Sequence, residues 1–465
     1  MASLASRKGM KVAVIEPGPL GGTCLNRGCI PSKMLIESAE VAQTIRRSPT
    51  FGIDSEIKKV DFPAIMRRTM EFIDDESSGI EEAINANPKY TLYKNFARFL
   101  APKKLLVGKE EIEGDQIVIA AGTSPFVPPI PGLDKTAYHT SDTIFRLENQ
   151  PQHVVFIGGG YISCEMAHFF GGLGSEVTVL DRGELLVSNE DGEIARKFTE
   201  VFSRNYNIIM QANISGVSGP APGKEGEVKV EYSVGDSKET TVAGDLLFVA
   251  TGRAPATGSL QCKEAGYELS ERGFLVVNEY LETSVEGVWA LGDIVGKAPF
   301  KHGANYEAKI VAHNLFLSGD KRMKADYSVM PHAIYSSPQV GGVGLTEEQA
   351  KEKKIDYAVG RYPYIKTGMG KALDDQDGFA KIIADQKSRK IVGAHILGTD
   401  SSILIHELIV AMAACGGDVA AITDSIHIHP ALSEVVQRAV NAVSFEGPPA
   451  EKRKTLMERT TDQSI

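Results

Sequence analysis

The chain of 465 residues lacks the features of a secreted or membrane-bound protein. It has only five cysteines, too few for a scaffold built on disulfides. No uncharged apolar stretch reaches the roughly 20 residues that a membrane-spanning helix needs. The first ten residues are basic, but no apolar signal-peptide core and no cleavage site follow them. The sequence therefore predicts a cytoplasmic protein without a membrane partner.

Positive charge is also scarce. The 50 Lys and Arg residues are outnumbered by 60 Asp and Glu residues, which gives a formal net charge of −10. No long basic run interrupts this balance, so nucleic acid is not an expected partner. Hydrophobic residues make up 42% of the chain, and its length suits about three domains of ordinary size. We expect a globular protein with large buried cores.

Two of the five cysteines lie close together in residues 21–33, which read GGTCLNRGCIPSK. In a protein without secretory features, the pair Cys24 and Cys29 favours redox or metal chemistry over a structural disulfide. On a regular helix, residues five apart are separated by about 7.5 Å of rise alone. A disulfide usually needs a Cα separation of about 4.4–6.8 Å. The segment must therefore bend between the cysteines, which Asn26 and Gly28 permit.

The residues after this bend favour a reactive thiol. Pro31 suits the first turn of a helix that begins just after Cys29, and the free N–H groups of such a turn lower the pKa of a thiol. Lys33 adds a nearby cation. A zinc site would need two more Cys or His ligands, and the other cysteines have no partner at ligand spacing: Cys164, Cys262 and Cys415. We predict a redox-active cysteine pair and no metal site, rather than half a zinc site or two inert core thiols.

An internal repeat relates two parts of the chain. Residues 154–157 are a buried strand followed by a glycine turn, and residues 177–180 are a second strand that ends at Asp181. An acid about 20 residues after the glycine turn is typical of a dinucleotide-binding βαβ unit. Residues 12–15, which end at Glu16, have the form of the second strand. The chain therefore contains two copies of the unit.

The first copy is incomplete in this sequence. Aligning Glu16 with Asp181 places Met1 on Met166, inside the crossover helix of the second copy. The first strand, the glycine turn and the start of the helix are then missing, although this turn is the part that receives a pyrophosphate. We expect a truncated first βαβ unit, and we expect the reading frame to continue upstream of Met1.

The cysteine segment resembles the active-site segment of the flavin-dependent pyridine nucleotide–disulfide oxidoreductases. Residues 427–434, which read HIHPALSE, are similar to the catalytic His-Pro segment of the same family. The resemblance implies an α/β fold with two Rossmann-like dinucleotide-binding domains and an α+β C-terminal dimerisation domain. It also implies that Cys24 meets the substrate disulfide, while Cys29 lies against the flavin.

The same resemblance assigns an acid–base pair. Histidine can move a proton near neutral pH, as thiol–disulfide exchange requires. His429 would be this base, and Glu434 would orient its ring. In these enzymes the histidine reaches the cysteines of the partner subunit, so a homodimer is implied. Lys33 and Glu165 match the family's ion pair beside the flavin.

The expected cofactors are FAD and a nicotinamide dinucleotide. At the end of a strand, Asp181 favours NAD because a carboxylate accepts from a ribose 2′-OH, whereas the adjacent Arg182 suits a 2′-phosphate, so NADP stays open. The glycine motifs and the resemblance together imply the following cofactor contacts: Glu16, Gly22, Thr23, Lys33, Ala121, Gly122, Gly158, Gly160, Tyr161, Ile162, Glu165, Asp181, Arg182, Gly252, Arg253, Asp293, Lys301 and Ala304.

The pattern of elements also predicts the domain order. The expected parts are a truncated FAD-binding domain, an NAD(P)-binding domain, the second part of the FAD-binding domain, a dimerisation domain and a polar tail: residues 1–150, 151–255, 256–328, 329–447 and 448–465.

Dihydrolipoyl dehydrogenase is the leading functional prediction, with a small-molecule or lipoyl-domain disulfide as the substrate. Residues 138–143 and 428–432 also resemble mycothione- and glutathione-type reductases, which are the alternative. A non-catalytic scaffold that has lost its flavin is a third reading, from a different functional class.

Overall fold

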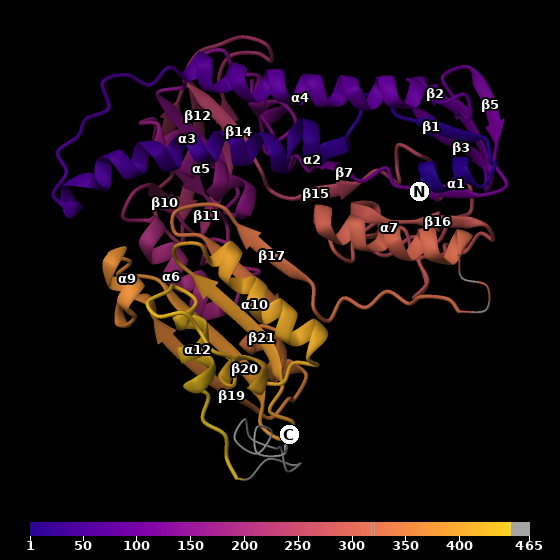
Figure 1. Cartoon of the computed structure of the whole chain (residues 1–465). Coiled ribbons are helices and arrows are strands. Elements are labelled where there is room, and N and C mark those ends of the chain that lie inside the picture. Colours follow the sequence, from indigo (N-terminus) through magenta and orange to yellow (C-terminus); the bar gives the residue numbers. More distant parts are fainter. Residues whose placement is uncertain (318, 320, 448–465) are drawn as a thin grey trace, which may run out of the picture.

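The computed structural model describes residues 1–317, 319 and 321–447; the predicted tail 448–465 lies outside them. Two long helices, α3 (Cys29–Arg47) and α4 (Phe62–Asn85), pack together along one edge of the molecule (Figure 1). The N-cap of α4 is Asp61, whose side chain accepts from the backbone N–H of Ala64. The buried face of α4 repeats every three or four residues: Phe62, Met66, Thr69, Met70 and Ile73.

The second βαβ unit forms a parallel sheet of four strands in the order β10-β9-β8-β14. Its strands are almost uninterrupted apolar runs, as expected where helices cover both faces of a sheet. Helix α5 (Tyr161–Gly172) connects β8 to β9, so the predicted order of strand, glycine turn, helix and strand is confirmed. The strands have these bounds: β8 (His153–Ile157), β9 (Glu176–Leu180), β10 (Asn207–Ile209) and β14 (Leu246–Val249).

The first unit repeats the end of the second. Helix α1 (Ala2–Arg7) and strand β1 (Val12–Ile15) match the last part of α5 and strand β9. Between helix and strand, Gly9 has φ +90° and the matching Gly174 has φ +106°, a conformation that glycine adopts without strain. The alignment of the two copies is therefore correct.

The sheet of the first unit is divided into two pairs. Strand β1 pairs in parallel with β2 (Tyr90–Tyr93), and β16 (Val288–Ala290) pairs in parallel with β6 (Ile117–Ile119). Among the described residues, no strand joins these pairs, whereas β8 fills the corresponding central position of the second unit. The expected gap in the first unit is present in the structure.

Two small antiparallel sheets were not predicted from the sequence. They contain β3 (Ala97–Ala101), β4 (Lys104–Val107) and β5 (Glu110–Glu113), and β11 (Ala212–Ser218), β12 (Val228–Val234) and β13 (Thr240–Gly244). A further antiparallel pair, β7 (Thr123–Pro125) and β15 (Arg253–Pro255), connects the two dinucleotide units. The exact domain boundaries stay predictions.

The C-terminal domain is a five-stranded antiparallel sheet in the order β17-β18-β21-β20-β19. Helix α10 (Ser401–Ala414) packs on β18 and β21, and helix α12 (Glu434–Asn441) packs on β19 and β20 (Figure 1). The strands are β17 (Pro331–Ile334), β18 (Val340–Gly344), β19 (Tyr357–Pro363), β20 (Phe379–Asp385) and β21 (Ile391–Leu397). Strands β17 and β19 were not predicted from the sequence. Both are edge strands, where proline is tolerated but weakens the strand signal.

Buried charges join this domain to the nucleotide unit. The side chain of Lys381 is only 1% exposed, and its ammonium lies 2.7 Å from a carboxylate oxygen of Asp191 and 2.8 Å from one of Glu347. Asp191 also caps helix α6 (Gly192–Phe202). Removing one member of such a buried group would leave uncompensated charge, so the contact fixes how the two domains meet. No described helix is long and apolar enough to cross a membrane.

Candidate active site

The two cysteines lie on either side of a helix break. Cys24 belongs to α2 (Gly22–Arg27), and Cys29 is the first residue of α3. Gly28 stands between the helices, and a Cβ on it would lie only 3.0 Å from the carbonyl oxygen of Thr23. The break therefore has the position that the disulfide spacing predicts, and a larger residue there would be tightly packed against the backbone of Thr23.

A buried asparagine holds this segment in place. The side-chain amide of Asn26 donates to the carbonyl oxygens of Leu20 and Gly22, both at 3.0 Å. From the sequence, Asn26 was predicted only to permit a bend. Its structural role is larger, because it binds the backbone on the N-terminal side of the cysteines.

The environment separates the two thiols electrostatically. Both are free, and a hydrogen bond between them is the main reason that the pKa of Cys29 falls to about 6 while the pKa of Cys24 rises above its ordinary value. Lys33 also lowers the pKa of Cys29, against burial and the charge of Glu165. The positive charge of Lys301 lowers the pKa of Cys24 and so opposes part of its rise. These shifts favour the thiolate form of Cys29 and the protonated form of Cys24.

We expect Cys24→Ala to raise the pKa of Cys29, because the substitution removes the hydrogen bond that most stabilises its thiolate. The measurement is the pH dependence of Cys29 alkylation by iodoacetamide in reduced protein, followed by peptide mass spectrometry. Cys24→Ser is the matched control, because serine keeps a donor and should retain more of the lowered pKa. The same alkylation midpoint in all three proteins would contradict this assignment.

Lys33 and Glu165 form an ion pair next to the cysteines. The ammonium lies 2.7 and 2.8 Å from the two carboxylate oxygens, and the Glu165 side chain is 5% exposed. Glu165 also accepts from the backbone N–H of Tyr335 at 3.0 Å, and Lys33 lies 4.6 Å from the centre of the Tyr335 ring. Tyr335 was missed by the sequence analysis, and it comes from the C-terminal domain.

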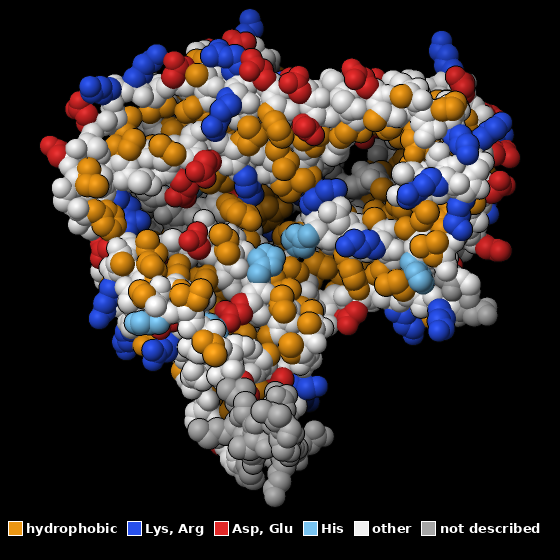
Figure 2. Space-filling model, in the orientation of Figure 1, with side chains coloured by type: hydrophobic (Ala, Val, Ile, Leu, Met, Phe, Trp, Pro, Cys, Tyr) orange, Lys and Arg blue, Asp and Glu red, His pale blue; other side chains and the backbone are white. Residues whose placement is uncertain are grey.

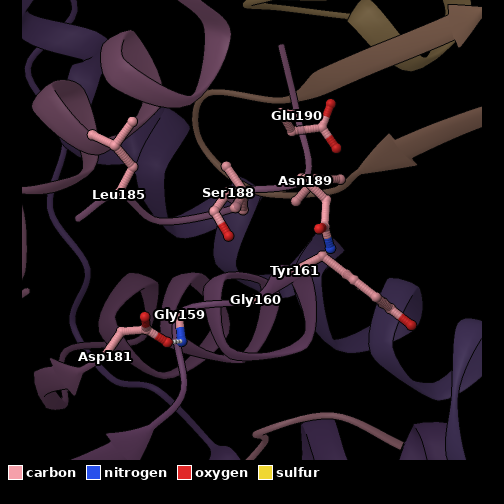
Figure 3. Close-up of a pocket in the computed structure, with 10 residues that line it drawn as sticks. Gly159, Gly160, Tyr161, Asp181, Leu185, Ser188, Asn189 and Glu190 are labelled. Carbon is pink, nitrogen blue, oxygen red and sulfur yellow. Dashed lines mark hydrogen bonds between the residues drawn. The ribbon is translucent and has the colours of Figure 1, made fainter. Parts of the chain in front are cut away.

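The glycine turn of the second unit forms the base of a pocket (Figure 3). Gly158 has φ +108°, and a Cβ on it would collide with the carbonyl oxygen of Ala250 at 2.4 Å. Asp181 accepts from the backbone N–H groups of Gly159 and Gly183, both at 2.6 Å. The carboxylate thus orders the turn as well as facing the pocket. Arg182 is exposed and is not a lining residue.

A second cluster of polar residues surrounds Asp293, which lies three residues after the end of β16. The hydroxyl of Thr123 donates to its carboxylate at 3.1 Å, and the guanidinium of Arg253 lies 3.9 Å from it. Buried Glu307 accepts from the backbone N–H of Gly292 at 2.6 Å. Glu307 was missed, although it is an acid within the buried stripe of α7 (Lys301–Phe316), a position where an unpaired carboxylate is costly.

The remaining predicted cofactor residues are distributed around these groups. Glu16 follows β1, and its carboxylate accepts from the backbone N–H of Gly18 at 2.9 Å. Gly22 and Thr23 begin α2, and Ile162 lies in the first turn of α5. The others line the connections near Asp293 or the start of α7: Ala121, Gly122, Gly252, Lys301 and Ala304.

His429 and Glu434 form a pair in the C-terminal domain. The ring Nδ1 lies 3.1 Å from both carboxylate oxygens, and the hydrogen bond from His429 lowers the pKa of Glu434. The histidine side chain is 75% exposed, whereas that of Glu434 is 8% exposed. None of the hydrogen bonds or ion pairs in the described chain connects His429 with Cys24 or Cys29.

Comparisons with known proteins agree with this geometry. Residues 1–312 match the pyridine nucleotide-disulphide oxidoreductase family, and residues 330–440 match its dimerisation domain. The chain belongs to the pyridine nucleotide-disulphide oxidoreductase family. The expectations of an α/β fold with a Rossmann-type oxidoreductase part and a dimerisation domain are confirmed.

Several members of this family resemble the whole chain. Mycothione reductase of Mycobacterium tuberculosis is 36% identical over 92% of this chain and 94% of that protein. Mitochondrial dihydrolipoyl dehydrogenase of Pisum sativum is 33% identical over 94% of this chain and 87% of that protein. The structure of the HOCl-induced flavoprotein disulfide reductase RclA from Escherichia coli has a TM-score of 0.82 and 30% identity, covering 95% of this chain and 97% of that chain.

Members of this oxidoreductase family depend on FAD and a pyridine nucleotide. The described residues fit a flavin near the cysteines. Gly122 and Gly252 have φ +67° and +129°, and no atom lies within 4 Å of where their Cβ would be, so both leave open space beside Asp293. Figure 2 shows the surface hollowed between the α3 side and the α7 side of the molecule. Among the described residues, no strand fills the central position of the first unit, where a dinucleotide fold receives a pyrophosphate, so the fit to a flavin rests on the residues around Asp293 and the cysteines.

Proposed function

We propose that this protein is a dimeric, FAD-dependent enzyme that transfers two electrons between NAD(P)(H) and a disulfide–dithiol couple through Cys24 and Cys29. The observation that carries the proposal is the position of two free cysteines on either side of the helix break at Gly28, beside the Lys33–Glu165 ion pair. The lowered pKa of Cys29 and the raised pKa of Cys24 agree with this reading, since a reduced redox-active pair needs one stabilised thiolate and one thiol.

The chain's own groups support the following steps. The Cys24 sulfur attacks one sulfur of the substrate disulfide, which breaks that bond and releases the other sulfur as a thiolate. His429 of the partner subunit takes the Cys24 proton and returns it to the leaving sulfur. The Cys29 thiolate then attacks the Cys24 sulfur, which forms the internal disulfide and releases the second substrate sulfur as a thiolate. The bound flavin would pass electrons from the nucleotide to that disulfide, and dithiol oxidation is the same sequence reversed.

The match of residues 330–440 to the family's dimerisation domain supports the dimer. A thiol that resists ionisation needs a base, and His429 is exposed on the dimerisation domain. Apolar side chains exposed nearby suit a subunit interface, since large apolar patches mark interaction surfaces. They are Ile403, Val410, Ile426 and Ile428.

Dihydrolipoamide is the leading substrate because the HIHPALSE segment has the form found in dihydrolipoyl dehydrogenases. A low-molecular-weight disulfide such as that of mycothiol is the second candidate, supported by the 36% identity to mycothione reductase. Purified protein should show a visible flavin spectrum. Its kcat/KM should be compared with NAD⁺ plus dihydrolipoamide and with NAD(P)H plus mycothiol disulfide or glutathione disulfide. A protein without flavin, inactive on all of these couples, would instead support a non-catalytic scaffold.

We expect NADH to be preferred over NADPH by about tenfold in kcat/KM, equivalent to about 1.4 kcal/mol. One oxygen of Asp181 accepts from the backbone N–H of Gly159 in the glycine turn, and the other accepts from that of Gly183, so its charge is fixed where a 2′-phosphate would meet it. Steady-state rates with each nucleotide test this. Arg182→Ala is the matched variant, and it should change the NADPH rate more than the NADH rate. A tenfold preference for NADPH would reverse the assignment and favour a reductase.

A further inference from the structure

Glu190 lines the nucleotide pocket but belongs to no dinucleotide-binding motif. It lies on the segment after Asp181, and Figure 3 places its carboxylate on the side of the pocket opposite Asp181. Its side chain is 7% exposed, and its Oε2 lies 2.7 Å from Nε2 of His332. Among the described residues, its other oxygen, Oε1, has no hydrogen-bond partner. A carboxylate this buried, with one free oxygen in a pocket, is available to a ligand.

His332 connects Glu190 to the reactive side of the molecule. On strand β17, His332 and Ile334 face the same side because they are two residues apart, and Ile334 also lines the pocket. The next residue, Tyr335, binds Glu165 through its backbone N–H. Burial lowers the pKa of His332, but the hydrogen bond and charge of Glu190 outweigh it and raise that pKa.

The pocket therefore has two ends with different surroundings. At one end Asp181 orders the glycine turn. The other end is lined by Glu190, Ile334 and Tyr161. Burial raises the pKa of the Tyr161 phenol to about 12, and the charges of Glu165 and Cys29 also raise it. A dinucleotide carries two riboses, and its nicotinamide must point toward the redox groups.

We propose that Glu190 is a second ribose-binding carboxylate, which accepts a hydrogen bond from a hydroxyl of the nicotinamide ribose, and that His332 is the positioning residue that holds it. This inference rests on the proposed function, because it assumes that the pocket binds NAD(H) or NADP(H). The imidazole fixes one carboxylate oxygen and balances its charge in a site that receives an anionic pyrophosphate. The other oxygen is left for the sugar.

The test is direct nucleotide binding by the flavin-loaded protein, measured by calorimetry with NAD⁺, nicotinamide mononucleotide and 5′-AMP. Glu190→Gln should weaken NAD⁺ and nicotinamide mononucleotide by about tenfold, the usual size for a hydrogen bond to a charged group. It should leave 5′-AMP unchanged. His332→Ala should have a similar effect, and the double variant should be no weaker than the stronger single variant.

Glu40→Gln is the matched control. Glu40 forms the same kind of pair, with its Oε1 2.8 Å from Nε2 of buried His168, but neither residue lines the pocket. Its nucleotide affinities should match those of the unmodified protein. Unchanged NAD⁺ affinity in Glu190→Gln, or an equal loss of 5′-AMP, would overturn the inference alone. Failure of the unmodified protein to bind any of the nicotinamide nucleotides would instead contradict the proposed function.

Discussion

Replacing Cys24 with serine is expected to abolish disulfide turnover, by roughly 10⁴-fold or more, as loss of a covalent nucleophile does in other enzymes. The reason is specific to this pair. In the proposed mechanism the lowered pKa of Cys29 favours its thiolate, and Cys24 is the thiol that forms and breaks the bond to substrate. Serine keeps the size and a hydrogen-bond donor, so α2 and the start of α3 should keep their structure.

The measurement for Cys24→Ser is turnover with each candidate disulfide, beside nucleotide oxidation with an artificial electron acceptor that bypasses the cysteines. The second activity should survive, because the pocket over the glycine turn does not include Cys24. Cys415→Ser is the matched control, since this exposed cysteine lies outside the site and should be dispensable. Substantial disulfide turnover in Cys24→Ser would remove Cys24 from the mechanism.

His429→Ala should lower disulfide turnover by about 10²–10⁴-fold, the usual contribution of a general acid–base group. The raised pKa of Cys24 favours assistance by a base, and Glu434 holds Nδ1 of His429, whose side chain is 75% exposed. Electron transfer from the nucleotide should be unaffected, which pre-steady-state absorbance can follow separately.

His427→Ala provides the comparison for His429. The side chain of His427 is 6% exposed, with its Nε2 2.5 Å from Glu407, so it is held within its own subunit. It should lower disulfide turnover far less than His429→Ala. Equal losses in the nucleotide and disulfide steps of His429→Ala would indicate a folding or assembly defect instead of lost acid–base catalysis.

The fold was largely predictable because its strongest signals are local and repeated. The distance along the chain from the glycine turn at Gly158 to the acid at Asp181 is typical of a dinucleotide-binding unit. The similar strand before Glu16 then indicated a second copy of that unit. The helix break at Gly28 followed from the distance that a disulfide allows. Edge strands such as β17 were not predictable, because Pro331 and short length remove the alternating pattern on which a strand prediction depends.

The parts of the site that were missed depend on contacts between distant segments. Tyr335 binds Glu165, and His332 binds Glu190, across the boundary between two domains. Neither residue stands in a motif, and no periodicity indicates its partner. Glu307 could have been found from the sequence, since an acid in the buried stripe of α7 needs a hydrogen-bond donor, here the backbone N–H of Gly292.

Subunit complementation tests the central claim most directly, namely that the active site combines the cysteines of one subunit with His429 of the other. Cys24→Ser and His429→Ala proteins, each nearly inactive, are mixed under conditions that exchange subunits. Each mixed dimer then holds one intact site, so equal mixing should restore about a quarter of the unmodified turnover in a twofold-symmetric dimer. Recovery of disulfide turnover at that level is the predicted result. No recovery, despite mixed dimers shown by native mass spectrometry, would contradict the account.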